Sequence, residues 1–426
     1  MDRFVGIIGI VLILGIAYAF SNNRKAISLK TIIPGFVLQV LLAVFVLKTP
    51  LGKNMFHAIG MFIQKILDFS NEGGNFVFGV LTNNPVKMEE LFGAGAGFIF
   101  ALKLIPTIIF ILILVNILYY YGIMQRVVEA CAKVMYKLMN VSGAESLSNI
   151  ASAFVGQVEA QIMIKPYLAT MTMSELLASM TGSMACIAGG VMAMYVGMGI
   201  PAEYLLAASI MAAPGALVIS KIVYPETDEP QTKNDVKIEI KKTHVNLIDS
   251  IAHGASDGMK VSINVIAMLI ALTALISMVD WMLGHLGLFM ANVLHMNLSF
   301  IHIDLTHLSL KEILGSIFSL FAVAMGVPFK EAMDVGALMG TKLVFNEFIA
   351  YLDLTALKPV LSQKSIVVAT FALCGFANLG SIAIQIGGIG ELAPNRRKDL
   401  AKLGVKALFC GTLASYLSAC IAGILL

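Results

Sequence analysis

Long uncharged apolar runs are the feature that most constrains what this chain can fold into. Five windows carry no charged side chain and approach the roughly 20 residues that a membrane-spanning helix needs: Phe4–Phe20, Thr31–Leu47, Leu104–Gln125, Val261–Val279 and Ala407–Leu426. Two windows are longer (Leu176–Ala202 and Ser365–Gly390), and two are shorter and contain or adjoin Pro and Gly (Tyr204–Ser220 and Ile313–Phe329). We therefore predict an all-α polytopic membrane protein with about eight transmembrane helices.

The composition supports this assignment and argues against other classes. Of the 426 residues, 58% are hydrophobic and 13% are charged, whereas an average soluble domain has about 25% charged residues. A soluble protein of this size with so few charges would expose a mostly apolar surface and aggregate. The formal net charge of +3 gives no basic excess, so nucleic acid is not expected as a partner. The five cysteines have no metal-ligand spacing, and we expect neither a disulfide nor a bound metal cofactor.

Residues 51–67 have a different pattern from the spans. Met55, Ile59, Phe62 and Ile66 repeat at helical spacing, while most polar residues of the segment fall elsewhere. This pattern predicts an interfacial helix over 51–67 that lies along the membrane surface.

Basic residues give the expected orientation. Arg24, Lys25 and Lys30 follow the first apolar window, lysines recur between 221 and 242, and basic residues occupy 396–398. Because such residues favour the cytoplasmic side, we expect an uncleaved first helix, a cytoplasmic loop after residue 225 and both termini on the outer side.

Two stretches, 144–167 and 330–351, place polar residues where lipid depth makes them costly. Each carries an early glutamate and then an amide–glutamate pair: Glu145 with Gln157 and Glu159 in the first, Glu331 with Asn346 and Glu347 in the second. The flanking apolar runs are too short for two complete crossings. We therefore predict two re-entrant helical hairpins.

Each hairpin is followed at nearly equal distance by one of the two long windows. Ala188 lies 29 positions after Glu159, and Ala377 lies 30 positions after Glu347. The glycines and polar residues at these points indicate helices that unwind near the bilayer centre, where exposed backbone is tolerated only if it lines a cavity or binds something. The unit hairpin–broken helix–helix thus occurs twice, and we expect the copies to be inverted, as in secondary transporters.

Glu159 and Glu347 are the central candidate site residues. An ionisable group at membrane depth costs on the order of 3 kcal/mol, although a glutamate at a helix end that reaches the interface is the alternative reading. Amides and a hydroxyl accompany them: Gln157, Asn346, Asn378 and Ser381. Such a surface suits a neutral solute rich in hydroxyls. Phe376 offers a face for a flat ring, and Lys165 and Lys342 are candidate counter-charges or snorkelling lysines.

Several of these segments resemble the signature motifs of the concentrative nucleoside transporter family. The motifs are Gly156-Gln157-Val158-Glu159-Ala160, Thr341-Lys342 through Asn346-Glu347-Phe348, Cys374-Gly375-Phe376-Ala377-Asn378-Leu379 and Ser381-Ile382-Ala383. The N-terminal Asn23-Arg24-Lys25-Ala26-Ile27 and the stretch from Asn71 to Gly79 also resemble bacterial members. The resemblance runs over almost the full length, with the motifs in the family's order.

The resemblance implies a homotrimer in the cytoplasmic membrane that imports nucleosides with a cation gradient by an elevator-type movement. It implies scaffold helices in 1–142, a first transport repeat in 143–224, a cytoplasmic loop and sixth scaffold helix in 225–310, and a second transport repeat in 311–426. By motif position, Gln157 and Glu159 face the nucleobase and Glu347, Asn378 and Ser381 hold the ribose. Asn346 and Phe376 lie nearby, and Val191 contributes backbone close to the base.

Two departures from the family pattern concern ligands. Val158 stands where many members have a hydroxyl residue, which removes one contact to the base. Ser152 and Cys186 stand where sodium-coupled bacterial members have Asn and Ser, and a thiol is a poor ligand for sodium. Backbone carbonyls around Val155 and Ile187 remain, so these four residues form a candidate sodium site, and Na+ and H+ both stay open as the coupling ion.

Two other functions stay open on the residues alone. An intramembrane enzyme would need a catalytic constellation, but neither HExxH nor GxSxG occurs. A passive channel for small polar solutes would carry flux only down a gradient, whereas a coupled carrier accumulates its solute.

Overall fold

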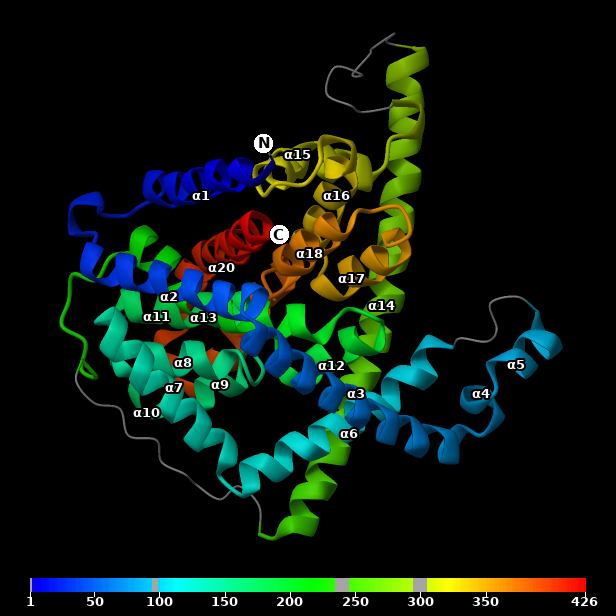
Figure 1. Ribbon diagram of the computed structural model, residues 1–426, viewed down its shortest axis with the longest axis horizontal. Coiled ribbons are helices and arrows are strands. Elements are labelled where there is room, and N and C mark those ends of the chain that lie inside the picture. The colour runs from blue at the N-terminus through cyan, green and yellow to red at the C-terminus, as the bar shows by residue number, and fades with distance from the viewer. Residues whose placement is uncertain (1, 94–98, 234–244, 294–304) are drawn as a thin grey trace.

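The structure is a computed structural model that describes residues 2–93, 99–233, 245–293 and 305–426. Every regular element within these ranges is a helix (Figure 1), so the predicted all-α class is confirmed. The lysines of the expected cytoplasmic loop beyond residue 233 lie outside the described residues, as does the segment 294–304.

The N-terminal part forms a series of seven α-helices within the described residues. They are α1 (Asp2–Ala19), α2 (Leu29–Lys48), α3 (Pro50–Phe78), α4 (Val80–Asn83), α5 (Pro85–Phe92), α6 (Phe100–Tyr120) and α7 (Ile123–Met139). Helix α3 starts where the interfacial helix is expected, because the Thr49 side chain caps the Gly52 N–H at 3.0 Å. It continues 11 residues beyond position 67 to Phe78, and Phe62 and Met61 on it are exposed apolar residues.

Helix α14 (Leu247–Asn292) is the longest element of the described chain at 46 residues. It runs as a rod along one side of the molecule and packs mainly on α6 (Figure 1). Glycine permits this packing, because a Cβ at Gly254 or Gly258 would meet the α6 backbone at Ile113 or Ile109. Trp281, Ile270 and other large apolar side chains of α14 stay exposed in the single chain, as expected of a surface that faces lipid or another subunit.

The first predicted repeat is present as hairpin, broken helix and closing helix. Hairpin 1 consists of α8 (Gly143–Ser152), a non-helical turn, α9 (Glu159–Ile162) and α10 (Lys165–Leu168). The broken helix is α11 (Met173–Ala185) with α12 (Gly189–Gly197), and the closing helix is α13 (Ala202–Val223). Capping boxes start α8 at Ser142 and α11 at Thr172, each with a glutamate three residues later.

The second repeat follows α15 (Leu310–Ala324) and has the same three parts. Hairpin 2 consists of α16 (Ala332–Val344) and α17 (Glu347–Leu357), the broken helix of α18 (Gln363–Leu373) and α19 (Leu379–Leu392), and the closing helix is α20 (Arg397–Leu425). The breaks fall at the polar and glycine-containing positions that the sequence indicated.

The two closing helices form the centre of the molecule. Helix α13 and the part of α20 from Ala407 to Gly423 are almost entirely buried; the two helices contact one another, and both contact α11 and α18. The two breaks also meet directly: Gly375 has φ +105°, and a Cβ there would collide with the Ala185 carbonyl at the end of α11. The halves of the chain therefore touch at their unwound backbones.

Six helices of the described residues are long and apolar enough to cross a membrane: α2, α6, α11 with α12, α13, α14 and α20 with the short turn before it. Three shorter apolar helices accompany them, at Val5–Ala19, Gln363–Leu373 and Leu379–Leu392. Three of the predicted windows are absent from these six: the window at 365–390 is divided by its break into two short helices, the window at 4–20 forms the shorter apolar helix Val5–Ala19, and the window at 313–329 falls largely in α15, which has 15 residues.

Candidate functional site

The carboxylate of Glu347 is the hub of a polar cluster that joins both repeats. Glu347 is the first residue of α17 and is 5% exposed. The Tyr195 hydroxyl on α12 donates to its Oε1 at 2.9 Å, and the Asn378 amide donates to its Oε2 at 3.2 Å. Neutral donors from the first repeat and from the second repeat's break thus hold one buried carboxylate.

Two asparagines at this cluster also start helices. Asn346 Oδ1 accepts from the Ile349 N–H at 3.0 Å, and Asn378 Oδ1 accepts from the Ser381 N–H at 2.9 Å. They are the N-caps of α17 and α19, so two helix N-termini begin beside Glu347. Helix N-termini that begin at unwound segments typically surround transporter substrate sites.

The other half of the predicted site lies at the tip of hairpin 1. Glu159 begins α9 and is exposed, while Gln157 and Val191 are half-buried. Gln157 Oε1 is buried without a hydrogen-bond partner among the described residues, which leaves an acceptor for a ligand. The tip packs on α19, because a Cβ at Gly388 would meet the side chain of Val158. Val158 therefore fills space between the repeats.

The four candidate sodium ligands lie in the first repeat, where the turn of hairpin 1 meets the break between α11 and α12. Ser152, Val155, Cys186 and Ile187 are all at most 4% exposed. The side chains at positions 152 and 186 already have internal partners: the Ser152 hydroxyl donates to the Ser148 carbonyl at 2.7 Å, and the Cys186 thiol faces the Ser209 carbonyl at 3.6 Å. The Ser209 hydroxyl lies 3.5 Å from the Ile187 carbonyl. A thiol and hydrogen-bonded hydroxyls fit sodium poorly.

A fully buried ladder of hydroxyls and one amide fixes hairpin 1 to α11. Ser148 pairs with Ser179 at 2.6 Å, and Ser152 pairs with Ser183 at 3.0 Å. Gln161, on the return arm, joins both rungs: its Nε2 donates to Ser148 at 2.9 Å and Ser183 at 2.7 Å, and its Oε1 accepts from Ser179 at 2.6 Å. We call these five residues the Ser–Gln ladder.

The lysine expected as a counter-charge in hairpin 2 has other partners. Lys342 is 1% exposed, and its ammonium donates to the Ala372 carbonyl at 3.0 Å and the Cys374 carbonyl at 3.4 Å. These carbonyls end α18. The corresponding lysine of hairpin 1, Lys165, is exposed.

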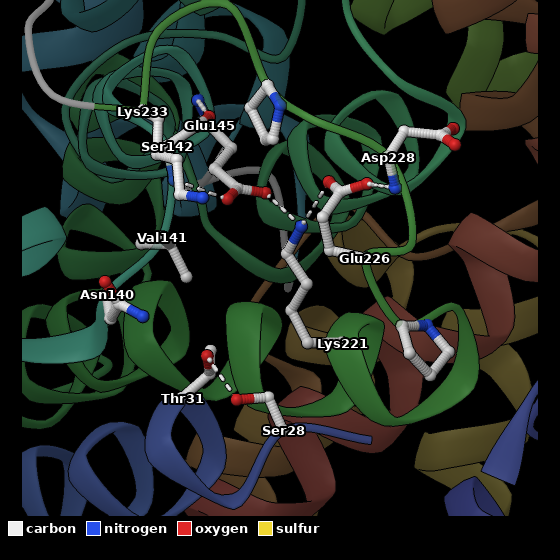
Figure 2. A pocket seen from close by; sticks show the side chains of 12 residues that line it. Ser28, Thr31, Asn140, Val141, Ser142, Glu145, Lys221, Glu226, Asp228 and Lys233 are labelled. Atoms are coloured by element: carbon white, nitrogen blue, oxygen red, sulfur yellow. Dashed lines mark hydrogen bonds and ion pairs between the residues drawn. The ribbon is translucent and has the colours of Figure 1, made fainter. Parts of the chain in front are cut away.

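A cavity of about 230 Å³ lies at the start of hairpin 1 (Figure 2). Its wall includes the buried Lys221, which pairs with Glu145 at 2.7 Å and Glu226 at 3.3 Å. Thr232 closes this region, because its carbonyl and hydroxyl accept from the Gly143 and Ala144 N–H groups at 2.8 and 3.1 Å. None of the predicted substrate residues lines the cavity, so we assign it to the anchoring of hairpin 1.

Comparison with known proteins decides the family. The family profile described as Na+ dependent nucleoside transporter matches residues 8–81 with its N-terminal part and 204–423 with its C-terminal part, and a nucleoside recognition profile matches 101–202. The chain belongs to the concentrative nucleoside transporter family. It is thus a member of a family of transporters, not enzymes.

The similarity covers whole chains. The nucleoside permease NupC of Helicobacter pylori is 39% identical over 98% of this chain and 96% of its own length. An uncharacterized transporter of Haemophilus influenzae is 43% identical over 100% of this chain and 98% of its own length. The solved structure of CNTnw in an inward-facing substrate-bound state matches with a TM-score of 0.91 and 41% identity over 100% of this chain and 98% of that one.

In this concentrative nucleoside transporter, the predicted residues fall into two groups. Glu347, Asn378 and Ser381 meet through hydrogen bonds, and Asn346 adjoins them. Among the described residues, Gln157 and Glu159 make no hydrogen bond or ion pair with that group. Sequence reasoning missed Tyr195 and Gln161. The sequence signal for Tyr195 is a single hydroxyl in the otherwise apolar segment that forms α12. The signal for Gln161 is an amide that lies between two pairs of serines, each pair spaced by four residues.

Proposed function

We propose that this chain is a secondary active symporter that imports nucleosides across the cytoplasmic membrane by alternating access. The observation that carries the proposal is the buried carboxylate of Glu347, held by Tyr195 of the first repeat and Asn378 of the second. A carboxylate with amide neighbours at two helix N-termini is suited to accept hydrogen bonds from ribose hydroxyls. Solved structures of CNTnw variants in outward-facing and intermediate states support a movement between accessible states.

The substrate contacts follow from the two groups of residues. We assign the ribose to Glu347, Asn378 and Ser381, with Asn346 and Phe376 beside them. The nucleobase lies against hairpin 1, where the unpaired Gln157 Oε1 accepts a base N–H and Glu159 is exposed. Val191, at the start of α12, adds backbone close to the base.

We further propose that the proton is the coupling ion. The hydroxyl of Ser152 and the carbonyl of Ile187 already have hydroxyl partners within the protein, and a thiol occupies position 186. By contrast, Glu347 is buried among neutral donors, and a carboxyl group in such a place is cheaper to bury when it carries a proton. Intramembrane carboxylates that alternate between these forms are typical proton carriers. Sodium is the second candidate, favoured by the family profile's description.

The test is uptake of radiolabelled uridine into proteoliposomes that contain the purified full-length protein. We expect an inward proton gradient to drive accumulation at least about tenfold above equilibrium, and an equal sodium gradient at constant pH to drive none. Accumulation under sodium alone would assign the ion to the site at Ser152 and Ile187. Equilibration without accumulation under either gradient would identify a passive channel and refute symport.

Assembly as a homotrimer and an elevator-type movement are part of the proposal. The exposed apolar length of α14 supports a subunit contact on that side. Native mass spectrometry of the detergent-purified protein should give three copies per particle, and a monomer that transports at the full rate would contradict it.

A further inference from the structure

The second repeat contains a buried lysine whose hydrogen-bond partners are all neutral. Lys342 lies in α16, the first arm of hairpin 2, and is 1% exposed. Its ammonium donates to three neutral oxygens: the carbonyls of Ala372 and Cys374 at 3.0 and 3.4 Å, and the hydroxyl of Ser415 at 3.5 Å. Among the described residues, no carboxylate oxygen lies within ion-pair distance of it. Burying an ammonium group away from a carboxylate is costly unless its hydrogen bonds satisfy acceptors that would otherwise lack a partner.

The oxygens that receive this ammonium are the ones a helix end leaves without partners. Helix α18 ends at Leu373, so Ala372 and Cys374 carry carbonyls at its C-terminus, where the helix has its partial negative charge. The unwinding of residues 374–378 removes the next helical turn that would otherwise satisfy them. A cluster of two carbonyls and one hydroxyl at a helix C-terminus is an environment for a cation.

The corresponding break of the first repeat has no such charge. There the hydroxyl of Ser209 from the closing helix α13 lies 3.4 Å from the Ala153 carbonyl and 3.5 Å from the Ile187 carbonyl. In the second repeat Ser415 of the closing helix α20 has the same role, donating to the Cys374 carbonyl at 2.7 Å. The ammonium of Lys342 is therefore an addition that only the second break has.

Lys342 also connects the two segments that carry the ribose residues. It precedes Glu347 by five positions in hairpin 2, and its acceptor Cys374 precedes Asn378 by four positions in the break. The Asn378 amide in turn donates to Glu347 at 3.2 Å. The Lys342 side chain thus joins hairpin 2 to the break, close to the hydrogen bond between Asn378 and Glu347.

We propose that the ammonium of Lys342 is a covalently tethered cation that fills the cation environment at the end of α18 and positions Glu347 against Asn378. Lys342 is in this sense a positioning residue, because it acts through these two side chains and not on the nucleoside. The proposal rests on the proposed function for its transport readout. It follows that removal of the lysine side chain opens a site that a small alkylammonium ion fills.

The experiment uses full-length Lys342→Ala protein in proteoliposomes, with uridine uptake measured with and without methylammonium. We expect Vmax/KM to fall about 100-fold, because the buried carbonyls of Ala372 and Cys374 lose their donor and Glu347 is no longer positioned against Asn378. Methylammonium at millimolar concentration should restore at least about a tenth of the wild-type value, whereas tetramethylammonium, which is larger and has no N–H, should restore none. Lys358→Ala is the matched control, since Lys358 also donates to a backbone carbonyl, that of Gly199, from an exposed position.

A second measurement covers the case in which Lys342→Ala is poorly folded. The thermal unfolding midpoint of the purified variant should rise with methylammonium and not with tetramethylammonium, and this readout does not depend on transport. Unchanged KM and Vmax in Lys342→Met, or an alanine variant that methylammonium neither stabilises nor reactivates, would overturn the proposal. If wild-type protein accumulates no nucleoside while the methylammonium effect on unfolding persists, the proposed function fails and the tethered cation stands.

Discussion

The two repeats share one architecture but satisfy their unwound backbones differently. In the first repeat, all the partners are neutral: Ser209 serves the break, and the Ser–Gln ladder fixes hairpin 1 to α11. In the second repeat, two charged side chains are added: Lys342 joins Ser415 at the break, and Glu347 at the hairpin tip is buried among neutral donors. The same secondary structure therefore supports two electrostatic solutions.

This difference separates the tasks of the two halves. The tip of hairpin 1 is fixed to α11 by neutral hydrogen bonds, and the buried ion pairs of Lys221 lie at the opposite end of this hairpin. In the proposed function, the charged groups of the second half respond to protonation and to hydroxyl-bearing ligands. We infer that adaptation to the base takes place at hairpin 1, and energy coupling takes place at hairpin 2.

The largest expected effect comes from the two glutamates. Glu347→Gln should lower Vmax/KM for uridine about 100-fold, because the amide removes both the charge and the titratable proton at the buried hub. Glu159→Gln should lower it only about tenfold, since that carboxylate is exposed. Glu129→Gln on α7, where the glutamate pairs with Lys133 in an exposed pair, is the control and should change nothing. Equal effects of the two site variants would abolish the distinction between the halves.

The link between the repeats is the next test. Tyr195→Phe removes one hydrogen bond to Glu347 and should raise the KM for uridine about tenfold, which corresponds to about 1.4 kcal/mol. Tyr351→Phe is a close control, because both tyrosines are fully buried with ring centroids 4.5 Å apart, but Tyr351 donates to the Thr370 carbonyl. Its KM should stay within about twofold of wild type. A normal KM in Tyr195→Phe would mean that the first repeat does not support the ribose site.

The smallest expected effect on transport comes from the Ser–Gln ladder. Gln161→Leu removes three hydrogen bonds from a fully buried cluster and leaves the serines with fewer partners than they have in the wild type, at a cost of about 1–3 kcal/mol in stability. The thermal unfolding midpoint should fall, with KM unchanged within about threefold. Gln125→Leu, which loses a single bond to the Tyr119 carbonyl, should lower the midpoint less. If Gln161→Leu instead acquired or lost sodium dependence, the ladder would belong to a cation site and not to a neutral brace.

Local sequence signals predicted the fold class, both hairpins and both breaks, because apolar length, glycine and misplaced polar residues are properties of short segments. The grouping of Glu347, Asn378 and Ser381 came from the motif positions of the family resemblance and not from these local signals. They did not predict Tyr195 as a partner of Glu347, since the two residues are 152 positions apart and meet only in the folded chain. The acceptors of Lys342 were not predicted either. They are backbone carbonyls, which become available only where a helix ends, and the sequence does not locate the end of a helix to within one residue.

The meeting of the two breaks at Gly375 and Ala185 has a consequence for how such a chain arises from two copies of one ancestral half. After a duplication, most positions of each copy are free to diverge, but here a methyl group on one copy would strike the main chain of the other. We therefore expect replacement of Gly375 by any larger residue to be tolerated only together with a compensating change at Ala185. Substitutions in one half of the chain would then depend on substitutions in the other half.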